Sequence, residues 1–156
     1  MTAADLVEKY TKAGLICATA ESCTGGLVAG AITDIPGSSA ILDRGFVTYS
    51  NTAKHQMLGV PNALFDTVGA VSLEVAEAMA EGAVKNSVAD IAVSITGIAG
   101  PGGSEFKPEG RVCFGLAQTG QPTVTEQLDF GAVGRAEVRR LSVEKALQLL
   151  GSAVAP

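Results

Sequence analysis

The spacing of apolar residues predicts five helices along the chain. In the first, apolar side chains recur at i, i+3, i+4 and i+7 from Ala3, and Gly14 is well placed to end the helix. In the last, the same spacing runs from Val143 to Leu150, and Gly151 is expected to end it. The helices between them are predicted over residues 22–33, 52–58 and 72–87.

Short apolar runs between these helices predict five strands. Residues 15–20, LICATA, form an unbroken apolar run that is too short for a helix, which is typical of a strand buried on both faces. Further strands are predicted over the ranges 41–49, 91–96, 112–119 and 123–130.

The order of these elements predicts the fold class. Strands and helices alternate in the first two thirds of the chain, which favours right-handed crossovers between parallel strands. The turn over residues 120–122 makes the last two strands an antiparallel pair. We therefore expect an α/β protein, a three-layer α/β/α domain over residues 1–156. Its mixed, mainly parallel five-stranded sheet would end in an antiparallel hairpin.

Charge and composition narrow the classes of partner. The 16 acidic and 11 basic residues give a net charge of −5, whereas nucleic acids are bound by clustered Lys and Arg. Because no segment resembles a signal peptide or a membrane span, we expect a cytoplasmic protein with no membrane or nucleic-acid partner. A hydrophobic content of 47% with 4% aromatic residues favours a homo-oligomer.

The single histidine, His55, restricts the chemistry further. It excludes metal sites built on paired histidines, and a histidine-based triad would depend on that one residue. The cysteines, Cys17, Cys23 and Cys113, lack the Cys-x-x-Cys spacing of a zinc site. We therefore expect no metal and no cofactor, and a reducing compartment.

Ligands of such sheets bind beyond the carboxyl ends of the parallel strands, so the loops there are the ones to consider. After the first strand, the small residues from Ser22 to Gly26 form a turn into a helix, where backbone N–H groups can bind a phosphate or an oxyanion. Alternatively, Ser22 or Thr24 only caps that helix. The sequence does not identify a partner for Glu21.

The loop after the second strand carries Tyr49, Asn51 and Lys54. If Asn51 caps the next helix, Lys54 lies in the first turn, where a cation is unfavourable. To act as a base near neutral pH, a lysine needs a pKa about 3 below its usual ~10.4, which also requires partial burial. The alternative is a solvated surface lysine, and we expect His55 to take no part.

The third loop, from Thr96 to Gly103, has glycines that let the backbone approach a ligand closely, although it could be a flexible connector. If the fifth strand runs parallel to the first, Arg135 reaches the same edge of the sheet and is a candidate phosphate contact. The alternative is that Arg135 only lies at the start of the last helix. A serine with a lysine can replace a serine with a histidine in acyl transfer. Ser22 and Lys54 are therefore a candidate catalytic pair.

Four segments carry a specific resemblance: TAESCTGGLVAGAITDIPGSSA, VTYSNTAKHQMLGVP, GAVSLEVAEAMAEGA and SITGIAGPGG. Over roughly residues 5–150 the chain resembles the CinA C-terminal domain family, which includes stand-alone nicotinamide mononucleotide (NMN) amidases of the PncC type. The resemblance implies hydrolysis of NMN to nicotinate mononucleotide and ammonia, in bacterial pyridine nucleotide (NAD) recycling. It places the catalytic roles on Ser22, Tyr49 and Lys54. It does not extend to the N-terminal domain of full-length CinA.

On this hypothesis Lys54, assisted by Tyr49, activates Ser22, and backbone N–H groups at the start of the second helix hold the oxyanion. The expected substrate-binding residues come from all the loops named above. They are Cys23, Thr24, Gly25, Asn51, Thr96, Gly97, Gly100 and Arg135.

Two alternatives remain at this stage. Cys23 is a rival nucleophile, because a helix N-terminus lowers the pKa of a thiol. The chain could also be a non-catalytic nucleotide-binding or regulatory module related to competence or the DNA-damage response, in which Ser22 is only a helix cap.

Overall fold

A five-stranded mixed sheet forms the centre of the computed structural model, which describes residues 1–104 and 106–155. The strand order is β2-β1-β3-β4-β5, and β1 is parallel to both β2 and β3. β4 is antiparallel to β3 and to β5, so β5 points in the same direction as β1. The strands are β1 (Cys17–Glu21), β2 (Leu42–Val47), β3 (Ile91–Gly97), β4 (Arg111–Gln118) and β5 (Val124–Asp129). This confirms the predicted mixed sheet with its antiparallel hairpin.

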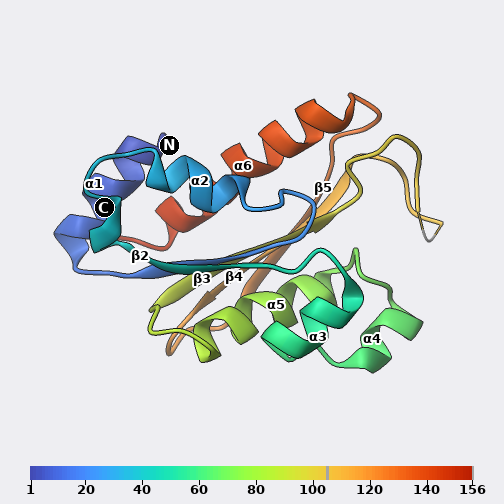
Figure 1. Cartoon of the computed structure of the whole chain (residues 1–156), viewed down its shortest axis with the longest axis horizontal. Helices are drawn as coiled ribbons and strands as arrows, with labels where there is room; N and C mark the ends of the chain where they lie inside the picture. Colours follow the sequence, from blue (N-terminus) through green and yellow to red (C-terminus); the bar gives the residue numbers. More distant parts are fainter. Residues whose placement is uncertain (105, 156) are drawn as a thin grey trace.

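Helices cover both faces of the sheet and make three layers (Figure 1). One face carries α1 (Ala3–Ala13), α2 (Leu27–Thr33) and α6 (Arg135–Ser152). The other carries α3 (Asn51–Leu58), α4 (Asn62–Thr67) and α5 (Leu73–Lys85). The predicted α/β/α arrangement is therefore confirmed.

Burial explains why β1 and β3 lie in the middle. All five residues of β1 are buried, and so are the first six of β3. Each strand packs one face against each helical layer, as its continuous apolar run predicts. On one face the buried Tyr10 of α1 donates a hydrogen bond to the carbonyl of Leu150 on α6 (2.7 Å), which joins the two ends of the chain.

Several details of the helices differ from the prediction. Ser50, not Asn51, caps α3, because its hydroxyl accepts the N–H of Ala53 (3.0 Å). The last helix passes through Gly151 to Ser152, and a Cβ on Gly151 would lie 2.6 Å from Cε of Met1. That glycine therefore serves close packing and does not end the helix.

The second helix starts later than predicted, and two short elements were not predicted. α2 begins at Leu27, and the residues before it form a turn. The additional elements are α4 and a 3₁₀ turn, η1 (Ser38–Ala40). Both are too short to show a helical period in the sequence.

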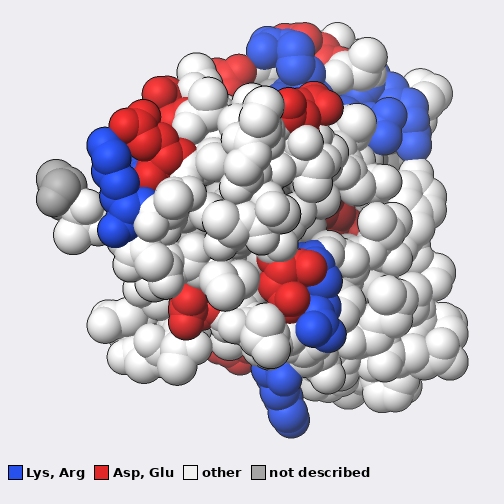
Figure 2. Space-filling model, turned by 60° about the vertical axis from the view of Figure 1, so that its left-hand side comes forward, with Lys and Arg blue, Asp and Glu red and all other residues white. Residues whose placement is uncertain are grey.

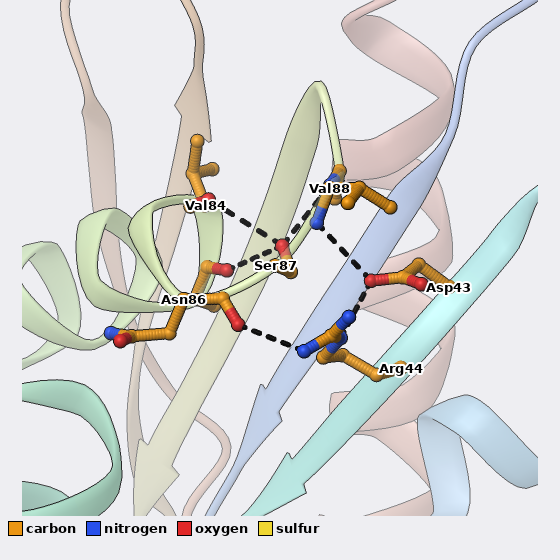
Figure 3. Close-up of polar contacts among 8 residues, drawn as sticks. Asp43, Arg44, Val84, Asn86, Ser87 and Val88 are labelled. Carbon is orange, nitrogen blue, oxygen red and sulfur yellow. Dashed lines mark hydrogen bonds and ion pairs between the residues drawn. The ribbon is translucent and has the colours of Figure 1, made fainter.

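The amino edge of the sheet is held by polar contacts (Figure 3). Arg44 of β2 pairs with Asp43 (Nε to Oδ2, 2.7 Å) and donates to the carbonyl of Asn86 at the end of α5 (3.2 Å). Asp43 in turn accepts the N–H of Val88 (3.3 Å). These bonds tie the edge strand β2 to the turn that leads into β3, at the end of the sheet opposite the loops discussed below.

Acidic and basic side chains are interspersed on the face that Figure 2 shows, and neither sign forms a broad area there. No helix in the described ranges combines the length and the apolar character needed to cross a bilayer.

Candidate active site

The loops at the carboxyl edge of the sheet enclose a pocket of about 340 Å³. Its wall is formed by the segments that follow β1, β2 and β3 and by the start of α6. The exit of β5 reaches this edge because β5 runs parallel to β1, as expected. Nine of the predicted site residues line the pocket: Ser22, Cys23, Tyr49, Asn51, Lys54, Thr96, Gly97, Gly100 and Arg135.

Ser22 and Lys54 are in direct contact within this pocket. The Nζ atom of Lys54 lies 3.1 Å from Oγ of Ser22, within hydrogen-bond distance. Only 8% of Ser22 and 2% of Lys54 is exposed, so Lys54 is not a solvated surface lysine. β1 ends just before Ser22, and α3 presents Lys54 four residues after its Ser50 cap. A buried hydroxyl beside a buried amine is an arrangement that can activate a nucleophile.

Glu21 fills the helix N-terminus that the sequence suggested as an anion site. One carboxylate oxygen, Oε1, accepts the hydroxyl of Thr24 (2.7 Å) and the N–H groups of Gly26 and Val28 (3.2 and 2.9 Å). The other, Oε2, accepts the N–H of Ala29 (3.1 Å). The dipole of α2 and these four donors stabilise a carboxylate that is 1% exposed. The expectation that Ser22 or Thr24 caps this helix is therefore wrong, and the N–H groups of Gly26, Val28 and Ala29 bind Glu21.

Cys23 differs from the expectation for a reactive thiol. Burial raises the pKa of the Cys23 thiol to about 12, whereas the helix N-terminus was expected to lower it. Since Glu21 occupies the end of that helix, the dipole acts on the carboxylate. The thiol therefore stays protonated near neutral pH, which disfavours Cys23 as a nucleophile.

The segment after β2 brings its polar residues to the pocket in different ways. Because Ser50 caps α3, the side chain of Asn51 is not needed as the cap and Asn51 lines the pocket. His55 is exposed, and its Nδ1 lies 2.9 Å from the carbonyl oxygen of Val60, to which it must donate. The histidine side chain therefore binds the segment that follows α3, and His55 does not line the pocket.

Tyr49 and Arg135 meet at the mouth of the pocket. Nη2 of Arg135 donates to the hydroxyl of Tyr49 (2.8 Å), and Nη1 donates to the carbonyl of Gly100 (2.7 Å). Tyr49 is 62% exposed. Arg135 thus bridges the loops after β2 and β3, and we find no hydrogen bond in the described ranges that joins Tyr49 to Ser22.

The loop after β3 is held in place by hydrogen bonds and close packing. Thr96, at 1% exposure, donates its hydroxyl to the carbonyl of Ala70 (2.8 Å). Gly100 has φ +91°, and a Cβ there would lie 2.0 Å from the carboxylate of Glu109. Glu109 also accepts the N–H of Gly102 (3.0 Å). These contacts hold the loop against its neighbours, so it forms one side of the pocket and is not a flexible connector.

Two predicted substrate contacts lie outside the pocket wall. Thr24 is fully buried, and its hydroxyl is bound to Glu21. Gly25 has φ +58°, and its Cα faces Arg139 of α6, because a Cβ would lie 3.4 Å from Nη2 of that arginine. Within the described ranges, no group of three or more His, Cys, Asp or Glu side chains is placed to hold a metal ion.

The sequence matches the CinA C-terminal domain family over residues 1–154. The chain belongs to the CinA C-terminal domain family. Its sequence is 50% identical over 147 residues to a CinA-like protein of Chlorobium phaeobacteroides, covering 92% of the chain and 35% of that protein.

Other members of the CinA family agree with this assignment. A putative competence-damage inducible protein of Symbiobacterium thermophilum is 60% identical over 109 residues, which cover 69% of the chain and 26% of that protein. The chain therefore spans about a third or less of the length of these relatives.

Solved structures of the CinA family have the same fold. The competence/damage inducible protein CihA of Agrobacterium tumefaciens superposes with a TM-score of 0.93 at 48% identity, covering 96% of this chain and 92% of that one. A CinA superfamily protein of Escherichia coli superposes with a TM-score of 0.93 at 35% identity, covering 97% and 88%.

Sequence reasoning missed two residues that shape this site. Glu21 had a usable signal, because a carboxylate between a buried strand and a helix lies where the helix dipole favours negative charge. Arg139, which donates to the carbonyl of Cys23 (3.1 Å), had none, because 116 residues separate the two positions.

Proposed function

We propose that this chain is an amidohydrolase that converts NMN to nicotinate mononucleotide and ammonia, with Ser22 as the nucleophile and Lys54 as its base. The observation that carries the proposal is the 3.1 Å contact between Nζ of Lys54 and Oγ of Ser22 in a buried setting. An amine within hydrogen-bond distance of a serine hydroxyl has the geometry that a general base needs.

The first half of the proposed reaction forms an acyl-enzyme. Neutral Lys54 takes the hydroxyl proton of Ser22 as Oγ attacks the carboxamide carbon, and the carbonyl oxygen becomes an oxyanion. The C–N bond then breaks, and the departing amine takes the proton from Lys54 and leaves as ammonia. An ester between Ser22 and the nicotinoyl group remains.

The second half repeats these transfers with water. Lys54 takes a proton from the attacking water, and the ester bond breaks. Oγ of Ser22 then recovers that proton from Lys54, and the carboxylic acid gives its own proton to ammonia or water and leaves as the carboxylate. The pyridinium ring of NMN is positively charged, which makes its carboxamide more electrophilic and further disfavours a protonated lysine beside it.

The rest of the pocket is assigned to substrate binding. Arg135 is the candidate contact for the phosphate, because a guanidinium pairs with phosphate oxygens. Asn51 and the wall from Thr96 to Gly103 are assigned to the ribose. The hydroxyl oxygen of Tyr49 accepts from Arg135, so its own proton can be given to a bound ligand, and we assign Tyr49 a part in relaying protons.

The proposal is tested by incubating the purified protein with NMN and measuring ammonia and nicotinate mononucleotide together. We expect both products in equal amounts, at a rate proportional to enzyme concentration. Saturable binding of NMN without either product would contradict the proposal and would favour a nucleotide-sensing module.

A further inference from the structure

The turn from Ser22 to Gly26 leaves one backbone donor at the pocket without an acceptor. The N–H of Ser22 donates to the carbonyl of Ile95 (2.9 Å), and the N–H of Gly25 donates to the carbonyl of Ser22 (3.0 Å). Across residues 1–104 and 106–155, we find no acceptor for the N–H of Cys23 or of Thr24, although Cys23 is 5% exposed and Thr24 fully buried. Of these two residues, Cys23 lines the pocket.

An unpaired N–H in a buried turn is rare in folded proteins. The N–H groups at the start of α2 cannot serve a ligand, because Glu21 holds those of Gly26, Val28 and Ala29. The Cys23 N–H therefore remains as a donor directly after Ser22. In α/β-hydrolases the N–H of the residue after the nucleophile is an oxyanion donor.

The orientation of this N–H depends on the carbonyl groups of the turn. In a trans peptide the C=O and the N–H point in opposite directions. The carbonyl of Ser22 is held inside the turn by Gly25, so the N–H of Cys23 points outward. The next two carbonyls are held from α6, because Arg139 donates from Nε to the carbonyl of Cys23 (3.1 Å) and from Nη2 to that of Thr24 (3.5 Å).

We propose that Arg139 is a positioning residue that fixes the turn after Ser22, so that the N–H of Cys23 stabilises the oxyanion. Arg139 does not line the pocket, and its guanidinium contacts the outer carbonyls of the turn. It therefore acts through Cys23 and does not touch the substrate. This inference rests on the proposed amidase reaction at Ser22.

Arg139 offers a better test than Glu21. Glu21 is fully enclosed, and removing its carboxylate would leave several donors of α2 unpaired, so such a variant could fail to fold. Arg139 is only partly buried. Its neighbour Arg140 provides a matched control, since it lies on the same helix and pairs at the surface with Glu137 and Glu144.

The experiment compares Arg139→Met, Arg139→Lys and Arg140→Met with the wild type, measuring kcat and KM for ammonia release from NMN and the Tm. We expect Arg139→Met to lower kcat roughly 10- to 100-fold, because a displaced oxyanion donor costs rate, with KM within about threefold. Arg139→Lys, which retains one donor for the Cys23 carbonyl, should be intermediate, and Arg140→Met should match the wild type.

A chemical rescue separates positioning from a loss of folding. Adding guanidinium ions at low millimolar concentration should restore part of kcat in Arg139→Ala and leave the wild type unchanged. Wild-type kcat in Arg139→Met, or a raised KM with unchanged kcat, would overturn the positioning role while the amidase proposal stands. If the wild type itself releases no ammonia from NMN, both proposals fall.

Discussion

Ser22 and Lys54 are 32 residues apart in the sequence, yet their side chains meet in the pocket. Their residue types alone do not indicate a reaction, because most serines and lysines are surface residues. Their significance comes from burial and contact, which place a hydroxyl beside an amine that is shielded from water. Position along the chain could predict the encounter, because both follow strands of a parallel pair.

The role of Lys54 is tested by Lys54→Met, which keeps the length of the side chain and removes its base. We expect kcat for NMN to fall by about 10²- to 10⁴-fold, the usual contribution of a general base. The Kd of NMN, measured by calorimetry, should stay within a few-fold. Lys85→Met, at the exposed end of α5, is the matched control and should behave as wild type. Weakened binding with retained kcat would instead make Lys54 a ligand contact.

At the scale of elements, α3 is positioned by its contact with α5. Gly82 of α5 lies so close to α3 that a Cβ there would lie 2.0 Å from the carbonyl oxygen of Leu58. Backbone cannot move aside cheaply in a packed interior, so a larger residue would push α3, and Lys54 with it, away from β1.

Gly82→Ala should therefore affect stability and activity together. We expect overpacking to lower the free energy of unfolding by about 1 to 3 kcal/mol, which corresponds to a Tm lower by roughly 2 to 12 °C, and to reduce kcat. Gly30→Ala in α2 is the contrasting variant, because nothing lies within 4 Å of its Cβ. It should raise stability by about 0.5 to 1 kcal/mol. Differential scanning fluorimetry compares the two, and equal Tm values would contradict this account of the packing.

The elements also show where sequence reasoning stops. Long amphipathic helices and buried strands were predicted well, because their periodicity reports burial directly. The cap of α2 was not, because its acceptor is a carboxylate on β1 and not a residue at the N-cap position. The short helix α4 was missed because its six residues are too few to show a helical period.

At the scale of the whole molecule, the site depends on strand directions. Because β5 runs parallel to β1, the chain returns to the carboxyl edge and delivers Arg135 to the pocket mouth. The hairpin prediction made this placement accessible from the sequence. The contact between Arg139 and the Ser22 turn was not accessible, because it depends on how α6 packs across the sheet.

The central claim is that Ser22, and not the adjacent Cys23, attacks the amide. It is tested most directly by measuring ammonia release from NMN by Ser22→Ala and Cys23→Ala beside the wild type. Ser22→Ala should lose roughly 10³-fold or more of kcat, as expected for a nucleophile. Cys23→Ala should keep most of its activity, because burial raises the pKa of that thiol to about 12 and leaves it protonated. Activity that survives in Ser22→Ala and disappears in Cys23→Ala would contradict the account.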